Sequence, residues 1–220
     1  MAELVSIKAA DGHRMRAFSA MPAGRPRGGL VVVHEFLGLT PYIESVCDAY
    51  AADGYAVAAP SLYDRQDPAV VFERDPGAMA KAAEMRKRLD WDEVLRDVEA
   101  ARTQVAKHGR CGVIGFCMGG SVAWLAASQP GFAAAVSYYG KDVPDWLDKK
   151  PACPVVLHFG ETDELIPLSG VERVRAAFPA LPVYVYPAGH AFDNPARGAD
   201  PAIPELARQR SLALLRAHVG

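Results

Sequence analysis

The chain has 220 residues, enough for one domain with a sizeable core, and half of them are hydrophobic, as in ordinary soluble globular proteins. Its formal net charge is −2 at pH 7, so the protein lacks the strongly basic character by which proteins bind nucleic acids or acidic membranes. We therefore expect a small-molecule partner, with neither nucleic acid nor membrane, while the choice between monomer and homodimer stays open.

The first part of the chain predicts a hairpin followed by alternating strands and helices. The dipeptide Asp11-Gly12 is a typical hairpin turn, and Gly54 ends a helix. The segment 61–77, rich in Asp and Pro, is a candidate loop over the mouth of a site. The elements expected here are strands over 4–9, 15–20, 29–34 and 55–59 and a helix over 42–53.

Strands and helices continue to alternate to the end of the chain. The expected helices cover 78–89, 92–107, 121–127, 168–178 and 204–218, and the expected strands 111–114, 133–138, 154–160 and 183–186. Alternation of this kind predicts an α/β fold, with a mostly parallel sheet covered by helices on both faces. Because no linker or repeat interrupts it, we expect a single domain over 1–220.

The most informative motif is Gly115-Phe116-Cys117-Met118-Gly119-Gly120, between a predicted strand and a predicted helix. It matches the nucleophile elbow, a sharp strand-to-helix turn, with sulfur in place of oxygen. Glycines two positions before and after Cys117 suit a strained, closely packed turn. The helix start favours the thiolate form of Cys117. The alternative is a buried structural cysteine in a glycine-rich turn.

Two further polar residues stand in loops directly after predicted strands. Asp163 follows the strand over 154–160, and His190 follows the strand over 183–186. With Cys117 they have the chain order of an α/β-hydrolase triad, and they stand at the carboxyl ends of strands, where open α/β sheets bind ligands. We prefer Asp163 over its neighbour Glu164 as the acid. The alternative is that each is an ordinary loop residue.

The sequence also bears on cofactors and compartment. The cysteines form no C-x-x-C pair and no zinc or disulfide spacing, and we interpret Cys47, Cys111 and Cys153 as small core residues. No nucleotide, flavin or metal motif is present, so we expect no cofactor. We expect a cytoplasmic protein, because no signal peptide or membrane-spanning stretch is evident.

Taken together, the motifs resemble the dienelactone hydrolases, or carboxymethylenebutenolidases, over nearly the whole chain. The resemblance rests on His34-Glu35-Phe36-Leu37-Gly38, on the elbow, on Gly160-Glu161-Thr162-Asp163 and on Gly189-His190-Ala191-Phe192. It implies the α/β-hydrolase fold and a Cys117, His190, Asp163 triad that hydrolyses lactones or related esters through an acyl-enzyme. It also implies that Glu35 lies beside Cys117 and regulates its ionisation. The alternative for Glu35 is a structural ion pair.

Substrate-binding residues are less clearly marked. The backbone N–H groups of Met118 and Phe36 are expected to bind the oxyanion. Ala191 replaces a polar residue common in the dienelactone enzymes, so whether the substrate carries a carboxylate stays open. The family's substrate-binding arginines lack a good match. Arg65, Arg74 and Arg86 stand before the elbow and Arg197 after His190, and we take Tyr63, Arg86 and Arg197 as the candidate substrate-binding residues.

The sequence therefore predicts a cysteine-dependent hydrolase of small lactones or esters. Cys117 attacks the carbonyl, His190 transfers the proton, and Asp163 holds the imidazole. One alternative is a broader carboxylesterase or thioesterase on the same triad. Another is a non-catalytic redox-sensing thiol, which would need an accessible resolving cysteine.

Overall fold

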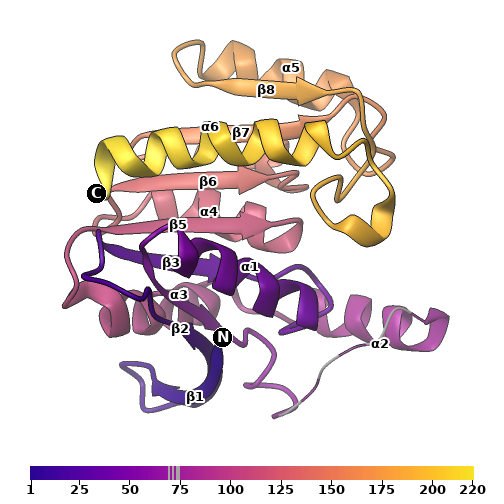
Figure 1. Cartoon of the computed structure of the whole chain (residues 1–220). Coiled ribbons are helices and arrows are strands. Elements are labelled where there is room, and N and C mark those ends of the chain that lie inside the picture. Colours follow the sequence, from indigo (N-terminus) through magenta and orange to yellow (C-terminus); the bar gives the residue numbers. More distant parts are fainter. Residues whose placement is uncertain (69, 71, 73–74) are drawn as a thin grey trace. The chain divides into compact units, whose positions relative to one another are not determined.

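The structure, a computed structural model, describes residues 1–68, 70, 72 and 75–220. It divides into two units, Met1–Cys111 and Gly112–Gly220, each of which is described by itself (Figure 1). The single domain predicted over 1–220 stays a prediction. Arg74, one of the candidate arginines, lies outside the described residues.

The first unit is a mixed sheet with helices on both sides. Its strands have the order β1-β2-β4-β3, where β2 is antiparallel to both of its neighbours and β3 is parallel to β4. The helices α1 and α3 lie on opposite sides of these strands (Figure 1). The predicted hairpin is confirmed, with Gly12 at φ 92° in its turn. The bounds are β1 (Glu3–Lys8), β2 (Arg14–Ala20), β3 (Gly29–Val33), α1 (Pro41–Ala52), β4 (Ala56–Pro60), α2 (Pro76–Lys87) and α3 (Trp91–Ala106).

The second unit is a fully parallel sheet of order β5-β6-β7-β8. Ser137 donates to the Gly120 carbonyl of α4 (2.9 Å), while the next residue, Tyr138, bonds Ser211 of α6 (2.8 Å). Since successive strand residues point to opposite faces, α4 and α6 cover opposite faces of this sheet. The bounds are β5 (Cys111–Phe116), α4 (Met118–Ala127), β6 (Ala134–Tyr138), β7 (Val155–Gly160), α5 (Leu168–Ala177), β8 (Val183–Tyr186) and α6 (Ala202–His218), with the short 3-10 helices η1 (Val143–Asp145) and η2 (Pro195–Arg197).

The central strands of the second unit are buried on both faces. Every residue of β5, β6 and β7 is buried, and so is every residue of α4. Continuous burial explains why these strands have unbroken apolar or small-residue sequences rather than an alternating pattern. In the part of the chain that the structure describes, no helix combines the length and apolar character needed to cross a bilayer.

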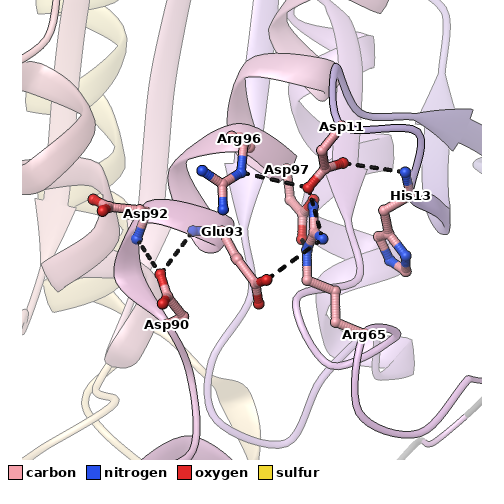
Figure 2. A network of polar contacts seen from close by, with 8 residues as sticks. All are labelled: Asp11, His13, Arg65, Asp90, Asp92, Glu93, Arg96 and Asp97. Carbon is pink, nitrogen blue, oxygen red and sulfur yellow. Dashed lines mark hydrogen bonds and ion pairs between the residues drawn. The ribbon is translucent and has the colours of Figure 1, made fainter.

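Arg65 holds a network of charged side chains in the first unit (Figure 2). It donates to both carboxylate oxygens of Asp97 (2.9 and 2.7 Å), a fully buried residue of α3, and pairs with Asp11 of the hairpin turn (2.9 Å). Arg96 also approaches Asp11 (3.4 Å), and the hydrogen bond from Arg65 is the main reason that the pKa of Asp11 falls to about 2. Arg65 therefore fastens the loop after β4 to the hairpin and α3, and its charge is already paired.

Candidate active site

Cys117 stands at the sharp turn between β5 and α4, with backbone angles φ 54° and ψ −114°. A positive φ is unfavourable for a residue with a side chain and persists only where the surroundings hold it. Here the N–H donates to the Tyr138 carbonyl (3.0 Å), and the carbonyl accepts from Gly120 (2.9 Å) and Ser121 (3.2 Å). The thiol, which is partly exposed, stands at the N-terminus of α4, where the helix dipole favours negative charge.

Glycines allow this turn to pack against its neighbours. A Cβ at Gly115 would overlap the carbonyl group of Gly119, and a Cβ at Gly120 would overlap the carbonyl oxygen of Tyr138. The steric need expected at Gly115 is therefore present. Gly120, for which the sequence suggested no such need, also allows α4 to approach the end of β6.

Gly115→Ala is expected to lower the free energy of unfolding by about 3 kcal/mol or more, because the clash is with backbone that cannot rotate away. Gly24→Ala is the matched control, since a Cβ there meets no atom within 4 Å, and we expect a change of less than about 0.5 kcal/mol. Urea unfolding of both variants measures the difference. Equal stabilities would show that the elbow tolerates a side chain at residue 115.

Asp163 lies in the loop after β7, and its side chain has no exposed surface. One carboxylate oxygen, Oδ1, accepts the N–H groups of Leu165 (2.8 Å) and Ile166 (3.2 Å). The other, Oδ2, lies 2.7 Å from Nδ1 of His190. Glu164 is exposed, and Asp163 is the carboxylate that bonds the imidazole.

The loops that carry Asp163 and His190 are joined through their backbones. Glu161 donates to the Tyr186 carbonyl (2.7 Å), and Thr162 donates to the Ala188 carbonyl (3.1 Å). A Cβ at Gly160 would overlap that same Ala188 carbonyl oxygen, so only glycine permits the approach. The two loops are therefore held in one fixed arrangement beyond the carboxyl ends of β7 and β8.

His190 is the residue that links the other two groups. Burial alone would lower its pKa, but the hydrogen bond with Asp163 and the electrostatic influence of Asp163 and Cys117 raise the pKa to about 9. Nδ1 faces Asp163, and the buried Nε2, the nitrogen left for Cys117, has no hydrogen-bond partner among the described residues. The structure thus brings Cys117, His190 and Asp163 together within the second unit.

Glu35 and Phe36 lie in the first unit, in the turn after β3. Glu35 is buried. The N–H of Leu62 donates to Nε2 of His34 (3.0 Å), so the ring proton is on Nδ1, which donates to the Glu35 carbonyl (2.6 Å). In a trans peptide the carbonyl and the following N–H point in opposite directions, so this bond also fixes the direction of the Phe36 N–H. Their positions toward Cys117 stay predictions.

The candidate substrate-binding residues occupy different surroundings. Tyr63 is fully buried, and its hydroxyl donates to the Phe36 carbonyl (2.8 Å). Arg86 lies near the C-terminal end of α2 in the first unit and is half-buried. Arg197, in η2, is exposed, and its Nε approaches the carbonyl oxygen of His190 (3.4 Å). Of the three, only Arg197 is shown to lie beside a residue of the candidate triad.

The remaining cysteines differ from Cys117. Cys47 and Cys111 are buried, as expected for core residues, whereas Cys153 is partly exposed. Burial raises the pKa of each of these thiols, to about 11 for Cys153. They therefore remain protonated at neutral pH. Among the described residues, no three His, Cys, Asp or Glu side chains are grouped so that they could hold a metal ion.

Known proteins match the chain over almost its whole length. The model of the dienelactone hydrolase family matches residues 15–219. A carboxymethylenebutenolidase from Pseudomonas putida is 30% identical, and the match covers 98% of this chain and 96% of the relative. A carboxymethylenebutenolidase from Pseudomonas sp. strain P51 is 31% identical, and the match covers 98% of this chain and 95% of the relative. A Klebsiella pneumoniae crystal structure, provisionally assigned as a dienelactone hydrolase, is 29% identical, with a TM-score of 0.85 over 97% of both chains.

A dienelactone hydrolase-like promiscuous phosphotriesterase from metagenomic libraries has a TM-score of 0.79 over 100% of this chain and 99% of its own, at 20% identity, and shares the fold. These likenesses confirm the predicted α/β-hydrolase fold with its mostly parallel sheet. They also confirm the resemblance on which the sequence prediction rested. The chain belongs to the dienelactone hydrolase family and is a hydrolase of esters or lactones.

Proposed function

We propose that Cys117, His190 and Asp163 are the catalytic triad of this hydrolase, and that it cleaves small lactones or esters through an acyl-enzyme. The observation that carries the proposal is a single imidazole that bonds Asp163 and is close enough to Cys117 for the two to interact electrostatically. His190 bonds Asp163 at 2.7 Å through Nδ1, and Cys117 acts on the same ring from a strained turn. A nucleophile, a base and a group that orients the base are the parts that covalent catalysis needs.

The charge state of the triad follows from the raised pKa of His190. With a pKa of about 9, the imidazole carries a proton at pH 7. We propose that Cys117 reacts as a thiolate paired with this imidazolium, so that the reactive form of sulfur exists before substrate binds. The N-terminus of α4 and the imidazolium both stabilise the negative charge on sulfur.

The reaction then proceeds in two balanced halves. The thiolate of Cys117 forms a bond to the carbonyl carbon, and the oxyanion collapses as the carbon–oxygen bond to the leaving alcohol breaks. His190 gives its proton to that alcohol, which in a lactone stays attached to the acyl group. The neutral imidazole next takes a proton from water, and the hydroxide displaces the sulfur. The products are a carboxylic acid and an alcohol, with the thiolate and imidazolium restored.

The backbone supports these steps. The N–H of Met118, at the first position of α4, is the proposed first donor to the oxyanion, and the N–H of Phe36 is the second. The direction of the Phe36 N–H is set by the bond from His34 to the Glu35 carbonyl. Glu35 is proposed to lie beside Cys117 and to regulate its ionisation, as the family resemblance implies.

The substrate class is proposed from the relatives and from the rim of the site. The relatives are named as carboxymethylenebutenolidases, whose substrate is a lactone. Arg197 bonds the carbonyl oxygen of His190, and for that reason it is proposed to meet a substrate carboxylate. Arg86 and Tyr63 complete the proposed binding set. A broader carboxylesterase on the same triad is the runner-up. The cytoplasmic location and the oligomeric state stay predictions.

A redox-sensing thiol is less well supported. Cys111 is the first residue of β5 and Cys153 precedes β7, whereas Cys117 follows the last residue of β5. The two ends of a six-residue strand are separated by roughly 15–20 Å, so neither thiol can form a disulfide with Cys117 without rearrangement. With respect to these two thiols, a hydrolytic nucleophile therefore accounts better for Cys117.

The test is a search for the acyl-enzyme. We expect p-nitrophenyl acetate to give a burst of p-nitrophenol and a mass increase of one acetyl group on Cys117, both lost in Cys117→Ala. Cys153→Ala, which removes the other partly exposed thiol, is the control and should behave as the wild type. Turnover of a dienelactone supports the lactone substrate. Turnover of the simple ester alone favours the carboxylesterase, and turnover of neither contradicts the proposal.

A further inference from the structure

Three residues other than glycine have a positive φ in the described part of the chain, and all lie in the second unit: Cys117 (54°), Tyr139 (38°) and Ala191 (58°). Each follows a strand end or lies in the His190 loop, beyond the carboxyl edge of the parallel sheet. Strained backbone of this kind concentrates at functional sites. Cys117 is the proposed nucleophile and Ala191 follows the proposed base, so Tyr139 is the strained residue that still lacks a role.

Tyr139 is placed against the imidazole of His190. It is fully buried, its ring centroid lies 4.9 Å from that of the imidazole at an angle of 59°, and its N–H donates to the His158 carbonyl (2.7 Å). The hydroxyl of Tyr139 donates to Oδ1 of Asp193, three residues beyond His190. The ring of Tyr139 thus contacts the imidazole, and its hydroxyl bonds the loop that carries His190.

The contact between Tyr139 and Asp193 holds the part of the loop that follows His190. Before His190, the backbone bond from Thr162 to Ala188 fixes the loop to the segment that follows β7. After it, Asn194 donates to the Ala191 carbonyl (3.0 Å), which makes a tight turn, and Phe192 is buried against the Tyr139 ring (5.4 Å between centroids). Asp193 lies at the tip of that turn, where its bond to Tyr139 holds the whole turn against the end of β6.

We propose that Tyr139 and Asp193 are positioning residues that act as one unit, holding the His190 imidazole in the orientation that reaches both Asp163 and Cys117. The proposal rests on the proposed triad. A bond through Nδ1 alone leaves the ring free to swing about that contact, and the Tyr139 ring blocks the movement on one side. A displacement of about 1 Å at a catalytic group can cost up to 10²-fold in rate, so a modest loosening is measurable.

The test compares Tyr139→Phe, Asp193→Ala, Asp193→Asn and the double variant Tyr139→Phe/Asp193→Ala. Tyr139→Phe keeps the ring and loses only the hydroxyl, and Asp193→Asn removes the charge but keeps an oxygen acceptor. Tyr186→Phe is the matched control, because it also loses a buried hydroxyl, bonded to His158 (2.9 Å) and Arg210 (3.1 Å), on a strand of the same sheet. All variants are checked by thermal unfolding.

With p-nitrophenyl acetate, we expect Tyr139→Phe and Asp193→Ala each to lower kcat about tenfold, with KM changed less than twofold. The double variant should be no slower than either single variant, because residues of one unit are non-additive. Asp193→Asn and Tyr186→Phe should stay near the wild type. If both single variants keep kcat within twofold, or if their effects multiply, the proposal is wrong.

A second readout does not depend on any substrate. The imidazole signals of His190, assigned by their absence in His190→Gln, are followed by NMR over pH 5 to 10. Looser contacts with Asp163 and Cys117 should move the His190 titration toward the ordinary value of about 6.5 in Tyr139→Phe and leave it unchanged in Tyr186→Phe. An unchanged titration in Tyr139→Phe overturns the proposal. Absence of Cys117-dependent hydrolysis in the wild type would instead overturn the proposed function.

Discussion

Cys117→Ser is expected to fold like the wild type and to lose ester hydrolysis by about a thousandfold or more in kcat. The reason is the resting charge state proposed for the triad. A thiol at the N-terminus of α4 can give its proton to His190, whereas a serine hydroxyl ionises far less readily in the same place. The elbow tolerates the substitution because oxygen is smaller than sulfur and the strained backbone of residue 117 is unchanged. Steady-state kinetics with p-nitrophenyl acetate, beside urea unfolding, measures both parts.

Cys117→Ala is the companion variant, since it removes the nucleophile altogether and defines the background rate. A serine variant that lies clearly above this background but far below the wild type agrees with a site arranged for a thiolate. A serine variant as active as the wild type would show that the site does not depend on a thiolate. A Cys117→Ser protein that is largely unfolded under the assay conditions would mean that the lost activity reflects folding rather than chemistry.

Asp163→Asn is expected to lower kcat/KM by about 10³- to 10⁴-fold at pH 7, because the amide no longer holds the imidazole in its orientation or stabilises its positive charge. The wild-type pKa of His190, about 9, sets the pH dependence. His190 is fully protonated well below pH 9 and loses its proton as the pH rises through that value. We therefore expect kcat/KM to fall on the alkaline side, near pH 9. Without the carboxylate, the pKa of His190 drops, and the alkaline fall should move to lower pH.

The measurement is kcat/KM for p-nitrophenyl acetate from pH 5 to 10 in the wild type and in Asp163→Asn. Glu164→Gln is the matched control, because Glu164 is the neighbouring acid but is exposed, and its profile should coincide with that of the wild type. If Glu164→Gln rather than Asp163→Asn moved the alkaline limb, the assignment of the acid would be wrong. A wild-type rate that rises steadily through pH 9 would contradict the thiolate and imidazolium pair.

Most of the helices and strands could be predicted from the sequence, because the patterns that specify them are local. The parallel strands β5, β6 and β7 are buried on both faces and therefore have continuous apolar or small-residue sequences, while glycines end helices and form the hairpin turn. Element bounds moved by a few residues: α2 begins at Pro76 rather than at 78, and Pro60 belongs to β4. Both prolines stand at element ends, where a missing N–H costs little.

The positions of the candidate triad residues also have a local signal in the sequence. A polar residue in a βα loop, directly after a strand, stands at the carboxyl edge of a parallel sheet. Cys117, Asp163 and His190 each follow such a strand, and the order of a known motif gave their partners. The preference for Asp163 over Glu164 rested on which position of this one loop faces the site. No comparable local signal marks the partners of Arg65, because an arginine in an irregular loop can pair with any acid that the fold brings near it.

Periodicity and turn residues along the chain are enough to predict which chemistry-bearing residues stand at strand ends. Which groups contact one another follows from the folded chain alone: Arg65 pairs with Asp97, Gly160 approaches Ala188, and Tyr139 contacts His190. These contacts join residues 28 to 51 positions apart, and Tyr139 has a backbone conformation that its residue type disfavours. Packing energy from many neighbours imposes such contacts, and no local pattern records it.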